Sequence, residues 1–327
     1  MRLIRKGEQV MRILKLFAPV MVALSYLPVI AIAGLAQTAA VGPDGSRPAR
    51  PVTIPLSVRV KNAAPGVEIQ TIDLTISEDG EPQTILSIRA MATNSPITLA
   101  VLIQDDLLPG IGTEIRLIRQ FVRDLPRGSR VMVGYVRTGT LQVRQRFTTD
   151  LEKAARALRP PNGLASAAPY NPYVEVIEAI KRFESQPAGR RAILLLSDGL
   201  DTSRGLDSSE PTQSVDLQRA INEAQRKSIA IYGFYAPTAL SAANLRLSSN
   251  AQSSLLRLAD ETGGRAFFQG TGAPVSLAPF IEGLERALEK QLAVTFLSTH
   301  LNRGFHKLEV RSSTPGVEVS YPAGYFR

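Results

Sequence analysis

The sequence predicts an α/β protein with a doubly wound, mostly parallel sheet and a small accessory β unit. Three observations lead to this prediction. Short apolar runs that end in polar turns, of which Ile97 to Ile103 is the clearest, are typical of strands buried on both faces of a parallel sheet. Segments with helical periodicity alternate with such runs between residues 93 and 292. Alternating strands on either side of this region indicate a separate β unit.

The accessory β unit is expected from residues 52–92 packing with residues 293–327. Its first half should contain three strands, at Val52 to Val60, Thr71 to Ser77 and Pro82 to Ala90. Pro55 lacks an amide hydrogen, so it places the first strand at a sheet edge. Asp79-Gly80 between the second and third runs is typical of a tight hairpin turn.

The region from 93 to 292 should form one α/β domain. Periodicity predicts strands over 97–103, 130–137, 141–147, 191–196, 228–235 and 265–268, and helices over 113–125, 150–158, 173–183, 215–226, 253–262 and 279–292. Asp150 is placed to cap its helix by accepting an orphan amide hydrogen. Gly263 is expected to end the 253–262 helix in a left-handed conformation, so it is not part of a phosphate-binding loop.

Composition excludes several classes of function. The formal charge is +9, but residues 1–36 hold five basic residues and one acid, which leaves an excess of +5 on the remainder. The basic residues are scattered, so no nucleic-acid partner is expected. There are no cysteines, which excludes disulfides, thiolate chemistry, cysteine-ligated zinc and a lipoprotein anchor. The only two histidines, His300 and His306, are too few for a multi-histidine metal site.

Residues 1–36 have a basic start, an uncharged run from Leu16 and small residues before Gln37, as in a secretory signal peptide. The uncharged run is also long enough to span a bilayer, so an uncleaved N-terminal anchor remains an alternative. Residues 37–51 are small, polar and proline-rich, and they are expected to form a linker. The protein should therefore be exported to the periplasm, the cell envelope or the medium, and contact a membrane only through residues 1–36.

Carboxylates follow two of the predicted strands. Asp105 and Asp106 come directly after the strand at 97–103, and Asp198 follows the strand at 191–196. In an open α/β sheet ligands bind beyond the carboxyl ends of the strands, and hard cations such as Mg²⁺ take oxygen ligands. A phosphorylation site of the receiver type also has clustered acids here. It does not fit, because no lysine ends the strand at 228–235 and an exported chain would not meet a cytoplasmic kinase.

The order of elements, from a strand with an acidic turn to a strand followed by Ser197-Asp198-Gly199, resembles a von Willebrand factor A domain. Five segments resemble the von Willebrand factor A-related proteins of acidobacteria: ISEDGEPQTILSI at 76–88, FTTD at 147–150, GRRAILLLSDGLD at 189–201, LADETGGRAFF at 258–268 and FHKLEVRSSTPGVEVSYPAGY at 305–325. The resemblance covers residues 52–327. It implies a doubly wound, Rossmann-like domain with an adhesion-type site at the carboxyl edge of the sheet.

In that family the metal-ion-dependent adhesion site uses Asp-x-Ser-x-Ser after the first strand, a threonine in a second loop and an aspartate after a later strand. The resemblance places the first and last aspartates at Asp105 and Asp198, but Leu107, Pro109 and Ala167 stand where the hydroxyl ligands are expected. The site is therefore predicted to be degenerate and free of metal. On this interpretation the two carboxylates have structural roles: Asp105 caps a loop and Asp198 binds backbone amides. A rearranged Mg²⁺ or Ca²⁺ site with Asp105, Asp106, Asp198 and, nearby, Asp201 remains an alternative.

The function predicted from the sequence is a non-catalytic, exported interaction module of the adhesion type, without a cofactor. Its protein partner is unknown, and the expected contact residues are Asp105, Leu107, Leu108, Pro109, Tyr170, Asp198 and Asp201. Alternatives are a metal-dependent adhesion domain and a structural component of an envelope complex. An enzyme is not supported, because no motif supplies a nucleophile with its base, and no histidine is placed to activate Ser197.

Overall fold

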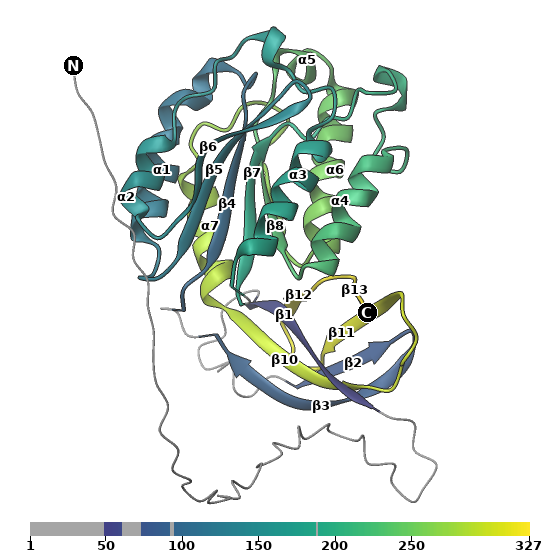
Figure 1. Ribbon diagram of the computed structural model, residues 1–327. Coiled ribbons are helices and arrows are strands. Elements are labelled where there is room, and N and C mark those ends of the chain that lie inside the picture. The colour runs from purple at the N-terminus through teal and green to yellow at the C-terminus, as the bar shows by residue number, and fades with distance from the viewer. Residues whose placement is uncertain (1–48, 61–72, 92–94, 188) are drawn as a thin grey trace, which may run out of the picture. The chain divides into compact units, whose positions relative to one another are not determined.

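The computed structural model describes residues 49–60, 73–91, 95–187 and 189–327 (Figure 1). These residues fall within one compact unit, Ser46–Arg327. The predicted signal or anchor at 1–36 and most of the predicted linker at 37–51 lie outside the described residues. Within the described part of the chain, no helix combines the length and apolar character needed to cross a membrane.

The centre of the α/β region is a six-stranded sheet with the order β6-β5-β4-β7-β8-β9. Its strands are β4 (Thr98–Gln104), β5 (Arg130–Arg137), β6 (Thr140–Thr148), β7 (Arg191–Ser197), β8 (Ala230–Tyr235) and β9 (Arg265–Phe267). All neighbours are parallel except β5 and β6, which form an antiparallel hairpin. The predicted fold class is confirmed. Every residue of β4 is buried, as expected for a central strand covered on both faces.

Helices cover both faces of this sheet (Figure 1). On one face lie α1 (Ile115–Asp124), α2 (Leu151–Ala157) and α7 (Ala278–Glu289), and on the other lie α3 (Pro172–Lys181), α4 (Val215–Arg226) and α6 (Leu245–Glu261). Successive side chains of a strand point to opposite faces, so Val101 joins the first apolar cluster while Ala100 and Leu102 join the second. The alternation within one strand thus builds two cores.

Two helical segments differ from the sequence prediction. The helix predicted over 113–125 begins with a 3-10 turn, η2 (Pro109–Glu114), before α1. The helix predicted to start at Ser253 starts eight residues earlier at Leu245, because the Asn244 side chain accepts the amide hydrogens of Arg246 and Leu247. A short helix that was not predicted, α5 (Ala239–Ala242), precedes it and is capped by Thr238.

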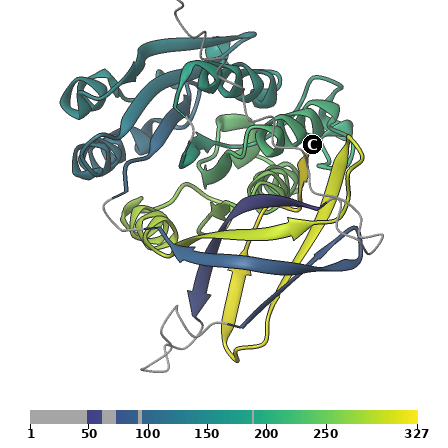
Figure 2. The same cartoon turned by 60° about the horizontal axis from the view of Figure 1, so that its bottom comes forward.

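The flanking segments form a seven-stranded antiparallel sheet with the order β12-β1-β10-β3-β2-β11-β13 (Figure 2). Its strands are β1 (Arg50–Val60), β2 (Leu74–Glu78), β3 (Glu81–Ala90), β10 (Gln291–Ser298), β11 (Phe305–Ser312), β12 (Val317–Ser320) and β13 (Gly324–Phe326). This confirms the accessory β unit. Its predicted hairpin turns at Asp79 and Gly80, which both have positive φ.

Two details of the accessory sheet correct the sequence prediction. The helix expected to reach residue 292 ends at Glu289, because β10 begins at Gln291 and buries Leu292 in the core of this sheet. Strand β1 is not an edge strand, since it lies between β12 and β10. Pro55 is tolerated because β12 pairs only with residues from Ser57 onward, so the missing amide hydrogen of Pro55 costs no ladder bond.

The accessory sheet packs where the parallel strands begin. Arg190, directly before β7, donates to the Gln291 side chain at 2.6 Å, and Gln291 donates to the Tyr232 hydroxyl at 3.2 Å. The turn after α6 contacts the chain before β13, where the Ala323 amide donates to the Glu261 carbonyl at 3.0 Å. Gly263 has φ +78, and a Cβ there would lie 2.8 Å from the Pro322 nitrogen. The accessory sheet therefore covers the amino-terminal edge and leaves the carboxyl edge to the loops.

Candidate functional site

The predicted site residues other than Tyr170 follow two adjacent strands, β4 and β7, which are in parallel register. Gln104, the last residue of β4, links them. Its amide nitrogen donates to Asp106 Oδ1 at 2.9 Å, while its carbonyl oxygen accepts from the Ser197 hydroxyl and from the Asp198 amide. The structure therefore brings the acidic turn after β4 and the Ser-Asp-Gly turn after β7 together, as expected from their place in the sheet.

Asp105 is fully buried and is held by positive charge. The Arg159 guanidinium donates to both of its oxygens, Nη1 to Oδ1 at 2.7 Å and Nη2 to Oδ2 at 2.9 Å. Asn162 donates its backbone amide to Oδ1 at 3.0 Å and its side-chain amide to Oδ2 at 2.9 Å. Arg137 Nε lies 3.3 Å from Oδ2. A bidentate guanidinium–carboxylate pair of this kind is among the stronger polar contacts in proteins.

Arg159 is fixed by the strand beneath it. Its guanidinium lies over the Tyr135 ring, with Cζ 4.0 Å from the ring centroid. The Tyr135 hydroxyl donates to the Arg159 carbonyl at 2.7 Å and accepts from the Arg159 amide at 2.6 Å. The hydrogen bonds to Asp105 raise the pKa of Arg159. The guanidinium therefore carries a permanent charge in a set position next to Asp105.

The partners of Asp105 were not identified from the sequence. Arg159 and Asn162 belong to the loop after α2, 54 and 57 residues away along the chain. No short motif marks them. Arg137 carried a usable signal, because β5 neighbours β4 and Val136 is in register with Gln104, which places Arg137 beside Asp105. A search for cations at the ends of neighbouring strands would have found it.

The residues at this edge do not fit a divalent cation at Asp105. Both carboxylate oxygens already accept two hydrogen bonds each, so their lone pairs are used. Leu107 and Ala167 are buried, and neither they nor Pro109 offers a side-chain oxygen. In the parts of the chain that the structure describes, no group of three or more histidine, cysteine or acidic side chains is placed to hold a metal ion.

Asp106 and Asp198 form a second acidic pair with different surroundings. Burial raises the pKa of Asp106 to about 6, and the nearby charge of Asp198 adds to this rise. Burial also raises the pKa of Asp198, although the Thr238 hydroxyl and the Leu200 amide donate to its carboxylate at 2.7 and 3.1 Å and favour the charged form. Among the described residues, no arginine, lysine or histidine lies within ion-pair distance of either carboxylate. Neutral donors alone hold this pair.

Asp201 is bound within its own loop. It accepts from the amide and hydroxyl of Ser203 at 3.0 and 2.6 Å, and from the hydroxyl of Ser214, the residue that caps α4. Asp201 is 7% exposed. Its role is to shape the turn between β7 and α4.

Burial corrects the predicted contact surface. Asp105, Leu107, Asp198 and Asp201 are all buried, so a protein approaching from solvent does not reach them. Leu107 packs in the apolar core, and its backbone forms an isolated bridge with Thr238. Of the predicted contact residues, Leu108 is half-buried, Pro109 is exposed and Tyr170 is 68% exposed. These three stay as candidates.

Further exposed apolar residues lie on the same loops and were not predicted. Leu164 is 58% exposed, Leu206 44% and Leu240 43%. Leu164 lies in the loop between α2 and α3, Leu206 lies in the connection from β7 to α4, and Leu240 lies in α5, which follows β8. We call the combined set the apolar rim; it consists of Leu108, Pro109, Leu164, Tyr170, Leu206 and Leu240.

Backbone hydrogen bonds connect the loops of the apolar rim to one another. The Gly163 amide donates to the Asp105 carbonyl at 2.9 Å, and the Leu108 amide donates to the Pro237 carbonyl at 3.0 Å. The Thr202 amide donates to the Tyr170 carbonyl at 2.8 Å. The rim is therefore carried by loops that support each other.

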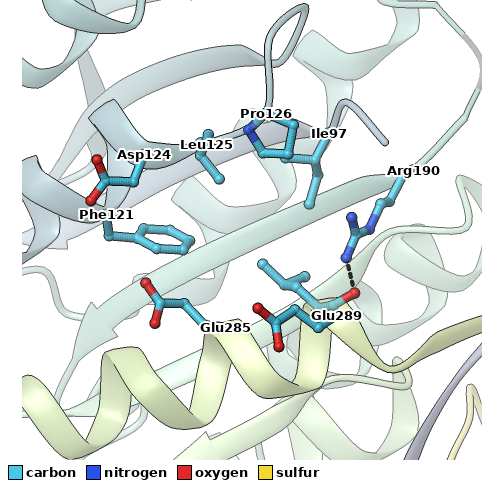
Figure 3. Close-up of a pocket in the computed structure, with 9 residues that line it drawn as sticks. Ile97, Phe121, Asp124, Leu125, Pro126, Arg190, Glu285 and Glu289 are labelled. Atoms are coloured by element: carbon cyan, nitrogen blue, oxygen red, sulfur yellow. Dashed lines mark hydrogen bonds between the residues drawn. The ribbon is translucent and has the colours of Figure 1, made fainter. Parts of the chain in front are cut away.

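A pocket of about 210 Å³ lies at the opposite, amino-terminal edge, between α1 and α7 (Figure 3). Asp124, Glu285 and Glu289 line it, and burial together with the charges of the other two acids raises the pKa of Glu285. Arg190 on the other side donates to the Leu288 carbonyl, the Ser95 carbonyl and Gln291. Because these hydrogen bonds occupy its donors, Arg190 links the α/β region to the accessory sheet and is not free to bind a ligand.

Comparison with solved structures finds proteins of similar fold. The chain is similar to an aerotolerance-related membrane protein from Bacteroides fragilis, with 13% identity and a TM-score of 0.42 over 60% of this chain and 100% of that chain. It is similar to a von Willebrand factor type A protein from Catenulispora acidiphila, with 10% identity and a TM-score of 0.42 over 86% and 74% of the two chains. No family model and no curated protein matches the sequence.

Identities and TM-scores this low carry no argument about site or activity. The von Willebrand factor A-like fold rests instead on the chain's own topology, with β4 at the centre, an antiparallel β6 at one edge and a helical layer on each face.

Proposed function

We propose that this protein is a non-catalytic interaction module that binds a protein partner through the apolar rim without a shared metal ion. The observation that supports it most is the buried Asp105, which is neutralised inside the chain by Arg159. In the adhesion family that the sequence resembles, the corresponding aspartate belongs to the metal-ion site. Here the guanidinium supplies the positive charge.

The remaining features of the edge favour a contact surface over a reaction centre. Ser197 is buried and donates its hydroxyl to Gln104, so it is not free as a nucleophile. The two histidines belong to the accessory sheet and its loops, away from these carboxylates. Exposed leucine and tyrosine side chains on supported loops suit a protein interface, because a surface that is already ordered loses little entropy on binding.

The setting of this interaction is part of the proposal. The signal-like residues 1–36 favour export, and the partner is then a protein of the cell envelope or the medium. The relation to acidobacterial proteins stays a prediction from the quoted segments. A structural role in an envelope complex differs from this proposal only in the partner.

A first experiment addresses the metal. Isothermal titration of the protein with Mg²⁺, Mn²⁺ and Ca²⁺ should show no site tighter than about 1 mM, because the Asp105 oxygens are occupied. The alternative, a metal-dependent adhesion domain, depends on Asp106 and Asp198, which lack a cationic partner within the described residues. Micromolar binding that is lost in Asp106→Asn would establish that alternative and overturn our proposal.

A second experiment addresses the rim. Cross-linking in the native envelope should yield an adduct that the Leu164→Ser/Tyr170→Ser double variant loses. Leu86→Ser is the matched control, since Leu86 is a 52% exposed leucine on β3 of the accessory sheet. Equal loss of the adduct in both variants, or in neither, would show that the rim is not the contact surface.

A further inference from the structure

A second charged region lies along β9, the edge strand of the six-stranded sheet. A cleft of about 580 Å³ is bounded by β9, by α6 and α7 on either side, and by β1 and β12 of the accessory sheet. Its volume is in the range of small-molecule sites. The cleft lies outside the apolar rim and shares no residue with it.

Four cationic side chains line this cleft: Arg59, Arg265, Arg286 and Lys290. They come from three elements: β1 carries Arg59, β9 carries Arg265, and α7 with the residue after it carries Arg286 and Lys290. Only two acids, Asp260 and Glu318, line it with them. The cleft therefore has an excess of positive charge.

The ion pairs in the cleft leave part of that charge unmatched. Arg59 lies 3.6 Å from Glu318, and Arg286 lies 3.7 Å from Glu282. Arg265 and Lys290 have no acidic group within 4 Å among the described residues. Burial lowers the pKa of Arg265, and the like charges of Arg59 and Arg286 lower it further. Burial raises the pKa of Asp260, while the charge of Arg265 opposes this rise.

The cleft also has an apolar wall. Phe268 is 42% exposed and Leu256 is 41% exposed, and both line it. The guanidinium carbon of Arg265 lies 5.0 Å from the centroid of the Phe267 ring, a cation–π contact that holds Arg265 beside this wall. A ligand with one anionic end and one ring can therefore contact charge and apolar surface at once.

We propose that this cleft binds a small phosphate monoester, with the phosphate at Arg265 and Lys290 and a ring portion against Phe268. Arginine forks match the oxygens of a phosphate, and a multiply charged anion relieves the repulsion among the four cations. The site is independent of partner binding at the apolar rim, since the two surfaces lie on different edges of the sheet.

The test is isothermal titration of the full chain at low ionic strength with inorganic phosphate and with phenyl phosphate. Binding of phenyl phosphate at about 1 mM or tighter is expected. Lys290→Gln and Arg265→Gln should each weaken it about tenfold, the effect of losing one charged hydrogen bond. Arg265→Lys should recover part of the loss. The matched control Arg246→Gln removes an exposed arginine of α6 that pairs with Asp207, and it should change nothing.

A second pair of measurements separates the apolar wall from the charges. Phe268→Ala should remove the preference for phenyl phosphate over inorganic phosphate while keeping the affinity for phosphate itself. Lys290 is exposed, so Lys290→Gln keeps the fold testable even if substitution of Arg265 disturbs packing on Phe267. The proposal would be overturned if neither phosphate nor phenyl phosphate bound at about 10 mM, ten times the expected dissociation constant. It would also be overturned if Lys290→Gln and Arg246→Gln bound phenyl phosphate equally well.

Discussion

Asp105 and the Asp106–Asp198 pair lie at the same edge of one sheet, yet their surroundings are opposite. Asp105 is 0% exposed and is matched by Arg159, by the nearby Arg137 and by two donors of Asn162. Asp198 is 3% exposed, and the Thr238 hydroxyl and the Leu200 amide, both neutral groups, donate to it. The comparison shows that two similarly buried carboxylates at one edge are held in different ways, one by a cation and the other by neutral donors.

The same comparison distinguishes charges that are paired within the fold from charges that are not. Asp105 with its bidentate guanidinium is part of the scaffold, whereas burial raises the pKa values of Asp106 and Asp198. The cleft along β9 presents the reverse case, since Arg265 and Lys290 have no acidic group within 4 Å in the described part of the chain. An anionic ligand could pair with these cations.

The largest effect should come from breaking the Asp105 pair. Arg159→Met removes the guanidinium and leaves a buried carboxylate short of its charge partner, which should lower the free energy of unfolding by about 3–5 kcal/mol. Urea denaturation measures it. Arg156→Met is the control, because Arg156 is an exposed arginine close by in the chain. It pairs with Glu152 at 3.4 Å, and its loss should cost less than about 0.5 kcal/mol. Equal losses in the two variants would remove the contrast.

A smaller, pH-dependent effect should come from the other pair. The pKa of Asp106 is raised from 3.8 to about 6 in the folded state, so folding favours the protonated form. Its contribution to stability is present below pH 3.8 and is lost as the pH rises through about 6. Asp106→Asn cannot ionise. Relative to wild type it should therefore gain about 1 kcal/mol between these two pH values.

Urea denaturation of both proteins across this pH range measures the difference. Asp150→Asn is a useful reference, because Asp150 is an exposed helix cap whose carboxylate accepts the Lys153 amide at 2.9 Å. Asp150→Asn should not become more stable relative to wild type as the pH rises. If the difference in the free energy of unfolding between wild type and Asp106→Asn stayed constant with pH, the pKa of Asp106 would not be raised by folding.

The smallest effect should come from the rim. Tyr170→Ser and Leu164→Ser remove side chains that are 68% and 58% exposed, so each should change the free energy of unfolding by less than about 0.5 kcal/mol. Thermal denaturation measures this. If the free energy of unfolding fell several times more than this, these side chains would stabilise the loops around Asp105. The rim would then be part of the scaffold and not only a contact surface.

Local patterns in the sequence determined most of the fold. The apolar run at 97–103 became the central strand because seven consecutive buried residues suit only a strand covered on both faces. The Asp79-Gly80 step became a hairpin turn because both residues adopt positive φ. Asp150 capped its helix as expected. The start of α6 was missed, since its first two turns are polar and only contacts with the sheet bury Leu247 and Ala251.

For the site, the sequence by itself determined where the carboxylates lie and that Leu107 and Pro109 supply no oxygen. Only the tertiary structure decided which acids are neutralised, which side chains face solvent and which cations share a cleft. The physical reason is that these properties depend on residues far apart in the chain, such as Asp105 with Arg159 and Arg59 with Arg265. Charge and burial are set by neighbours in space, and the periodicity of a segment reports only on its own faces.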